Sequence, residues 1–92
     1  FFRMKNQYSL DVLKNSHKGC FKNKEELLNY ENCGCFLCLN IFKTKELIEW
    51  IEESDKKETA ICPKCGVDSI LSEKYPISDK ILMEEMQNYW SE

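Results

Sequence analysis

Six cysteines in a chain of 92 residues constrain the fold more than any other feature. Four of them form two C-x-x-C pairs, Cys35-Phe-Leu-Cys38 and Cys62-Pro-Lys-Cys65, which are separated by residues 39–61. A C-x-x-C turn points two thiolates at one metal ion, and two such turns supply the tetrahedral set that Zn²⁺ takes in structural sites. The sequence therefore predicts one zinc ion per chain, held by Cys35, Cys38, Cys62 and Cys65.

The remaining cysteines and the single histidine are alternative ligands. Cys33 competes with Cys35, but only Cys35 gives the two-residue spacing to Cys38. Cys20 and His17 form an H-x-x-C pair that would suit a second metal. The simpler interpretation, which we prefer, is that Cys20 is a small buried side chain and His17 lies at the surface.

Two redox interpretations of the cysteines are less favoured. A thioredoxin-type dithiol needs one pair at the start of a helix in a βαβ unit, which two widely spaced pairs do not match. A rubredoxin-like iron centre also uses two cysteine turns, but only the second turn here is followed by a glycine, Gly66. Iron electron transfer is therefore kept as an alternative to zinc.

Size and charge restrict the function further. A chain of 92 residues forms one domain whose core alone gives little stability, so a bound metal would add folding energy. The sequence has no apolar run near the ~20 residues of a membrane span, and no charged-then-apolar leader opens it, so we expect a cytoplasmic protein. The abundance of lysine and asparagine is typical of AT-rich bacterial or phage genomes.

The charge balance disfavours nucleic-acid binding. The net charge is −3, and Arg3 is the single arginine among thirteen basic residues. Arginine is the usual side chain for reading guanine and clamping phosphates. A lysine patch at Lys18, Lys22 and Lys24 keeps a nucleic-acid-binding zinc ribbon as an alternative.

The expected fold is a small α+β, metal-stabilised domain. We expect a zinc-ribbon or treble-clef-like knuckle core with short hairpins and about three helices. Residues 1–22 are expected to form an N-terminal arm or short helix, and residues 23–92 the zinc-knuckle domain with its C-terminal helix. Asn23 and Glu26 match a capping box, which predicts a short helix over 24–30.

In the centre of the chain, the sequence pattern predicts short extended segments and one helix. Segments 33–35 and 39–42 flank the first cysteine pair. The spacing of apolar residues predicts an amphipathic helix over 45–53. Segments 59–62 and 67–71 are predicted to pair as a hairpin around the second cysteine turn.

The sequence pattern near the C-terminus predicts a helix over 79–90 that is capped by Ser78. The apolar side of this helix is expected to cover the knuckle hairpin. Trp90 lies on the flank of that side, where we expect it to contact a partner protein or a second copy of the chain. The acidic runs Glu52-Glu53 and Glu84-Glu85 are expected to be solvated. Because His17 is the only histidine, no catalytic Cys–His pair can be built elsewhere, and we expect no enzyme.

Two stretches carry a resemblance to a known family. Cys33-Gly-Cys-Phe-Leu-Cys-Leu-Asn-Ile-Phe42 and Thr59-Ala-Ile-Cys-Pro-Lys-Cys-Gly-Val-Asp-Ser-Ile70 resemble a family of small bacterial zinc-ribbon-like "cytoplasmic proteins". Shorter matches at Glu49–Ile51, Tyr75–Ile77 and Met86–Trp90 extend the resemblance over about residues 24–90. The resemblance implies a cytosolic metal-binding domain and no particular activity. The N-terminal extension departs from it.

The combined expectation is a non-enzymatic, zinc-binding protein-interaction module. Such a module would act as an adaptor, an immunity- or antitoxin-like factor, or a phage-borne inhibitor of a host defence protein. Its partner is expected to be another protein or, as a homodimer, a second copy of the chain. The alternatives are a nucleic-acid-binding zinc ribbon and a rubredoxin-like iron electron-transfer protein.

Overall fold

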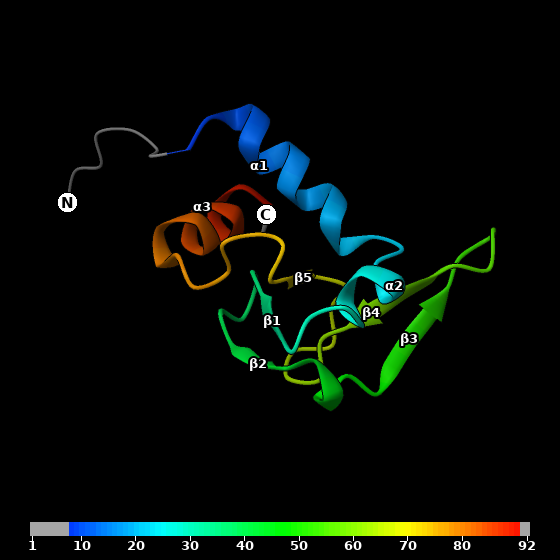
Figure 1. Cartoon of the computed structure of the whole chain (residues 1–92). Helices are drawn as coiled ribbons and strands as arrows, with labels where there is room; N and C mark the ends of the chain where they lie inside the picture. Colours follow the sequence, from blue (N-terminus) through cyan, green and yellow to red (C-terminus); the bar gives the residue numbers. More distant parts are fainter. Residues whose placement is uncertain (1–7, 91–92) are drawn as a thin grey trace.

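The computed structural model describes residues 8–90, which form three α-helices, two 3₁₀ turns and five short strands (Figure 1). The expectation of a small α+β fold with about three helices is confirmed. No helix within residues 8–90 is both long enough and apolar enough to cross a membrane. In chain order the elements are α1 (Leu10–His17), η1 (Lys18–Cys20), α2 (Lys24–Leu27), β1 (Asn32–Cys35), β2 (Ile41–Lys43), η2 (Thr44–Glu46), β3 (Glu49–Glu52), β4 (Glu58–Ile61), β5 (Ile70–Ser72) and α3 (Lys80–Trp90).

The strands form two small antiparallel sheets. One sheet has the order β2-β1-β5, and the other pairs β3 with β4. Helices α1 and α3 lie against each other on one side of the three-stranded sheet, and the β3–β4 arm extends to the other side (Figure 1). The two cysteine turns follow β1 and β4, so each sheet contributes one turn.

The three-stranded sheet separates two apolar clusters. Side chains alternate across a strand, so Leu71 of β5 joins the cluster beneath the helices while its neighbour Ile70 joins the cluster on the opposite side. Gly34 of β1 lies close to Ile77 and Met83, where an added Cβ would be 3.3 Å from each. The helix-side cluster contains Leu13, Cys20, Phe36, Leu71, Ile77, Leu82, Met83 and Met86. The cysteine-side cluster contains Leu27, Cys33, Cys35, Phe42, Leu47, Ala60, Cys62 and Ile70.

The predicted helix over 45–53 is wrong. Only a 3₁₀ turn forms at Thr44–Glu46, and Glu49–Glu52 is the edge strand β3, paired with β4 from Glu49↔Ile61 to Glu52↔Glu58. A helix would have required a buried apolar stripe, but Ile48 is 83% exposed and Ile51 46% exposed. Pairing with β4 provides hydrogen bonds for the backbone groups of this segment that face β4, and tryptophan and isoleucine suit a pleated strand.

The predicted hairpin between 59–62 and 67–71 is also wrong, although strands lie at both places. β4 pairs with β3, and β5 pairs with β1, with Gly34 opposite Leu71. Placing β5 beside β1 buries Ile70 and Leu71 completely, one in each apolar cluster. A two-stranded hairpin could not bury both faces, so the non-local pairing hides more apolar surface.

Asn23 does not form the predicted capping box, and α2 ends at Leu27 rather than at residue 30. The Asn23 side chain is buried and joins three segments of backbone. Its Nδ2 donates to the carbonyl oxygens of Gly19 (3.1 Å) and Ile70 (2.9 Å), and its Oδ1 accepts from the Ala60 N–H (3.1 Å). Asn23 therefore connects η1, β4 and β5, and so links the two sheets.

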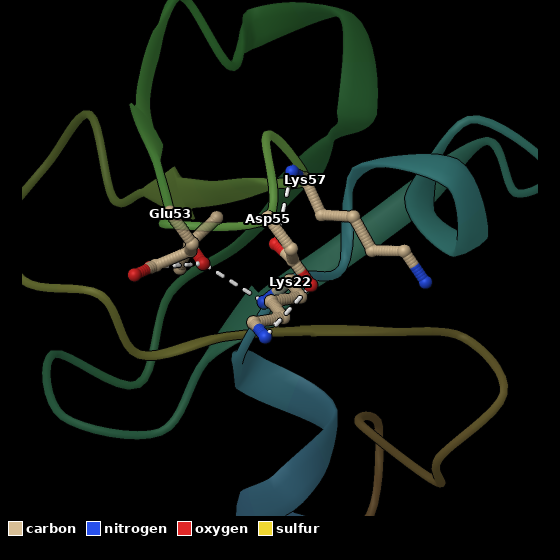
Figure 2. Close-up of polar contacts among 5 residues, drawn as sticks. Lys22, Glu53, Asp55 and Lys57 are labelled. Carbon is tan, nitrogen blue, oxygen red and sulfur yellow. Dashed lines mark hydrogen bonds and ion pairs between the residues drawn. The ribbon is translucent and has the colours of Figure 1, made fainter.

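A second polar network fixes the β3–β4 arm to the segment after η1 (Figure 2). The backbone N–H of Lys22, whose φ is +54°, donates to Thr59 Oγ1 (2.8 Å), and that hydroxyl donates to Glu53 Oε2 (2.7 Å). The Lys22 ammonium lies 2.9 Å from Asp55 Oδ2, and its hydrogen bond lowers the pKa of that carboxyl group. The Lys57 N–H donates to the other oxygen of Asp55.

The two longer helices pack on each other through α1's buried Leu13 and the inner face of α3. Helix α3 occupies nearly the predicted segment, but Asp79 rather than Ser78 caps it, since Asp79 Oδ1 accepts from the N–H groups of Ile81 and Leu82. The helix covers the three-stranded sheet rather than a hairpin around the second cysteine turn.

One of the expected solvated acidic residues is buried. Glu85 is 2% exposed and accepts a hydrogen bond from the Tyr8 N–H (3.0 Å). The other end of Tyr8 is hydrogen-bonded to Asp79 at the start of α3. Glu85 therefore faces the chain that leads into α1, and a carboxylate with hydrogen-bond donors can be buried there.

Candidate metal centre

The structure brings the sulfur atoms of Cys35, Cys38, Cys62 and Cys65 together. All four Sγ atoms lie within 4.8 Å of one another. Within residues 8–90 this is the only group of three or more histidine, cysteine, aspartate or glutamate side chains whose ligand atoms are close enough to share a metal ion. Four cysteines close together could hold one ion.

Two of the distances between the sulfurs are close to those of a tetrahedral metal site. Cys35 Sγ is 3.6 Å from Cys65 Sγ, and Cys38 Sγ is 3.7 Å from Cys62 Sγ. A tetrahedral site with metal–sulfur bonds of about 2.3 Å places its sulfurs about 3.8 Å apart. These separations are much longer than a disulfide bond of about 2.0 Å, and all six cysteines are free thiols.

The two cysteine turns have the same backbone geometry. In the first, the Leu39 N–H donates to the Cys35 carbonyl oxygen, and in the second, the Gly66 N–H donates to the Cys62 carbonyl oxygen, both at 2.9 Å. Leu39 and Gly66 have φ values of +62° and +78°. The first turn therefore closes as the second does, although a leucine replaces the glycine that this conformation favours.

Hydrogen bonds donated to the sulfurs favour the thiolate form, which is the form that binds a metal. The N–H groups of Leu37 and Lys64 point at the first sulfur of their own turn, at 3.4 and 3.3 Å. Two side chains outside the predicted ligand set also contact sulfurs: Asn40 Nδ2 lies 3.2 Å from Cys38 Sγ, and Ser69 Oγ lies 2.9 Å from Cys35 Sγ. The only sequence signal for them is a small polar residue shortly after each cysteine pair.

The environment of the four thiols differs from one side of the site to the other. Cys35 and Cys62 are buried, Cys38 is half-buried and Cys65 is exposed. Burial raises the pKa of Cys35 and of Cys62. Burial acts in the same direction on Cys38, but hydrogen bonds from Asn40 and from the neighbouring cysteines outweigh it and lower its pKa to about 7. Because a metal binds thiolates, occupation of this site releases protons.

The alternative cysteine ligands lie outside the cluster. Cys33 is completely buried in the cysteine-side cluster, and burial raises its pKa to about 12. Cys20 is buried in the helix-side cluster, where its Sγ lies 2.9 Å from the His17 carbonyl oxygen, and burial raises its pKa to about 12 as well. Both thiols therefore stay protonated near neutral pH, and neither is placed to complete the four-sulfur site.

His17 and Trp90 contact each other. The His17 ring stacks on the Trp90 indole, with centroids 3.8 Å apart and planes 26° from parallel, and lies 5.9 Å from the Phe36 ring. Burial lowers the pKa of His17, and the Asp68 carboxylate opposes that shift. Trp90, the last residue of α3, thus packs against the end of α1, and its Nε1 is buried with no hydrogen-bond partner among residues 8–90.

Comparison of the chain with protein-family models, with curated proteins and with solved structures gives no match. The family resemblance therefore rests on the sequence stretches alone, and these comparisons do not confirm it. The four-sulfur cluster is compatible with the zinc-ribbon-like site that the resemblance implies.

Proposed function

We propose that this chain is a non-enzymatic protein-interaction module whose fold is stabilised by one Zn²⁺ in a zinc-ribbon-like core. The observation that carries the proposal is the clustering of four cysteine sulfurs within 4.8 Å of one another, with one pair from the end of each sheet. Cys35 is the last residue of β1 in the three-stranded sheet and Cys38 lies in the turn after it, while Cys62 and Cys65 lie in the turn that follows β4. A metal at this point ties the two sheets together.

The composition of the ligand set supports a structural rather than a catalytic metal. Catalytic zinc sites keep one position open for water or substrate, whereas structural sites are closed by four protein ligands. Four thiolates close the coordination sphere. The metal would then supply folding free energy, on the order of 10 kcal/mol in apparent binding terms.

Zinc is proposed over iron, which stays the alternative of a rubredoxin-like electron carrier. Both metals accept four tetrahedral thiolates, so the sulfur geometry suits each of them. The two turns close with the same hydrogen bonds, which is compatible with either metal. Iron–thiolate centres absorb visible light and Zn²⁺ does not, so the absorption spectrum of the metal-loaded protein distinguishes them.

The nucleic-acid alternative has weaker support. Of the three lysines in the proposed patch, Lys22 is paired with Asp55 at 2.9 Å and Lys24 with Glu58 at 2.7 Å. Counterion release, which drives binding to the phosphate backbone, needs lysines that are free to contact phosphates. These ion pairs, together with the net charge of −3, favour a protein partner.

The proposed biological setting is the cytoplasm of a bacterium, with the module acting as an adaptor, an immunity- or antitoxin-like factor, or a phage-borne inhibitor of a host defence protein. The resemblance to small bacterial zinc-ribbon-like proteins supports this setting. The partner would bind the folded, metal-loaded domain.

The test is an elemental analysis of untagged protein combined with binding measurements. We expect one zinc per chain, no visible absorption band, and a specific protein partner whose binding is lost when a chelator removes the metal. An iron spectrum, or binding to DNA or RNA that falls steeply with salt, would replace the proposal with one of its alternatives.

A further inference from the structure

β3 has an open outer edge, whereas the outer edge of β4 is occupied. The Ala60 N–H of β4 donates to Asn23 Oδ1, so Ala60 faces away from β3. Residues that are directly opposite in an antiparallel pair share this orientation, so the backbone groups of Trp50 face away from β4. The Glu53 N–H donates to the Lys57 carbonyl oxygen, so the backbone groups of Glu53 face the β4 side. Backbone groups of successive strand residues point to opposite edges, so those of Glu52 face outward, as those of Trp50 do. No backbone hydrogen bond to these two outward positions is found within residues 8–90.

A hollow of about 440 Å³ lies beside this edge. Its apolar lining consists of Leu28, Tyr30, Leu47 and Trp50, and its polar lining of Glu31, Lys43, Thr44 and Lys45. Trp50 belongs both to the open strand and to the hollow. A side chain from a strand added next to Trp50 on the same face would lie over this hollow.

Two exposed carboxylates, Glu49 and Glu52, lie at the ends of the same strand. Glu49 and Glu52 are exposed and form no ion pair or hydrogen bond through their side chains with another described residue. Antiparallel pairing of two copies through this edge places residues of the same orientation opposite each other. In the registers centred on Trp50 and on Ile51, Glu49 then faces Ile51 or Glu53, and Glu52 faces Ile48 or Trp50. No basic residue meets either carboxylate in these registers, so a second copy leaves both without a counter-charge and is a poorer occupant than a basic segment.

We propose that the β3 edge binds an extended segment of a partner protein by strand addition, and that this segment has a basic–apolar–apolar–basic pattern. The inference rests on the proposed protein-interaction function and names the surface and the chemistry of its partner. The two basic residues lie opposite Glu49 and Glu52, one apolar residue lies beside Trp50 at the hollow, and the other lies beside Ile51, which is 46% exposed. The pattern reads the same in both directions, so it applies to parallel and antiparallel addition.

Selection from a displayed library of random twelve-residue peptides on the metal-loaded protein tests this surface. We expect the selected peptides to be enriched in the basic–apolar–apolar–basic pattern. Strand addition uses the backbone of every second peptide residue. N-methylation of the residues that face β3 should therefore abolish binding, and N-methylation of the alternate residues should change it less than threefold. Equal effects of the two sets would overturn the proposal.

A charge reversal on the strand provides the matched variant. Glu52→Lys should weaken binding of the selected peptides at least tenfold, while Glu84→Lys, the same change at an exposed position of α3, should leave it unchanged. Peptides that bind both variants equally would place peptide binding on another face, which overturns this surface and leaves the protein-interaction function standing. A selection that enriches no peptide also overturns the surface, whereas the proposed function is judged separately by metal content and native partner.

Discussion

Leu39 and Gly66 occupy the same position in the two cysteine turns, and both have a left-handed backbone, with φ values of +62° and +78°. Each follows the second cysteine of its pair, and each N–H closes the turn on the first cysteine's carbonyl oxygen at 2.9 Å. A glycine adopts this conformation freely, whereas a residue with a Cβ is destabilised by about 1 kcal/mol. The two turns therefore reach one geometry at different conformational costs.

Gly66→Ala should lower the free energy of unfolding by about 1 kcal/mol without loss of metal. An added Cβ at this position meets no atom within 4 Å, so the whole effect comes from the backbone. Gly66→Asn is the control, because asparagine tolerates the left-handed region better than alanine and should lose less. Urea unfolding of the metal-loaded variants measures the difference, and equal stability of the alanine variant and the original chain would contradict the prediction.

Cys62→Ser should abolish stoichiometric metal binding and unfold the domain, whereas Cys20→Ser should leave it folded and metal-loaded. The first change removes one of four clustered sulfurs. The second replaces a buried thiol near the His17 carbonyl oxygen with a hydroxyl that can donate to the same acceptor. Metal content per chain and the melting temperature of each variant check this pair. Equal destabilisation of both variants would show that Cys20 has a structural role as large as that of a ligand.

Asn23→Ala should lower the free energy of unfolding by about 3 kcal/mol. The change leaves the Ala60 N–H and the carbonyl oxygens of Gly19 and Ile70 without this partner, and each such buried group costs about 1 kcal/mol or more. Asn29→Ala is the matched control, because the single side-chain hydrogen bond of Asn29 is exposed. Chemical unfolding of the two variants side by side should separate them by at least about 2 kcal/mol.

Acid should destabilise the protein partly through His17. Burial lowers the pKa of His17 in the folded state, whereas the unfolded chain keeps the ordinary value of about 6.5. As the pH falls through about 6.5, the unfolded state binds a proton before the folded state does, so stability decreases until the pH drops below the folded pKa. His17→Phe should preserve the stacking on Trp90 and remove the part of the acid-induced loss of stability that comes from His17. The stability difference between the two proteins should be constant above about pH 7 and should shift in favour of the variant as the pH falls below about 6.5. Any metal loss in acid affects both proteins.

Trp90→Ala should destabilise the fold by about 2 kcal/mol while metal content stays at one per chain. The indole contacts the helix-side cluster and stacks on His17, so its removal takes away apolar burial and a ring contact. Thermal unfolding and elemental analysis measure the two effects. The sequence-based expectation that Trp90 contacts a partner stays a prediction, and loss of partner binding by a variant that is still folded would support it.

Local sequence patterns predicted the parts of the structure that local interactions determine. The four clustered cysteines were identifiable because each C-x-x-C turn is complete within four residues. Helix α3 was predicted almost to its ends, because eleven residues with a helical period leave little ambiguity. The clash that a Cβ at Gly19 would make with the Tyr75 ring, at 2.3 Å, joins residues far apart in the chain and has no local signal.

Non-local contacts decided the features that the sequence did not reveal. Residues 47–51 are short enough for their apolar spacing to fit a helix or a strand, and pairing with β4 selects the strand. Asn23 has the sequence context of a helix cap, but its amide is used by Gly19, Ile70 and Ala60 instead. Glu85 looks solvated in the sequence because the chain that covers it, at Tyr8, is far away along the sequence.

The β3–β4 arm is joined to the rest of the fold along β4 by residues 22–24 and, just beyond the strand, by the cysteine cluster, and this determines how it can move. Asn23 fixes it at Ala60, and the cysteine cluster begins one residue after the strand ends, at Cys62. A rigid body attached at two points can rotate only about the line that joins them, and the link from Lys22 to Thr59 opposes that rotation. Removing a metal from the cluster would release the arm at Cys62, so the arm could then rotate about its remaining contact with Asn23. The metal would then set the direction in which the arm points as well as the stability of the fold.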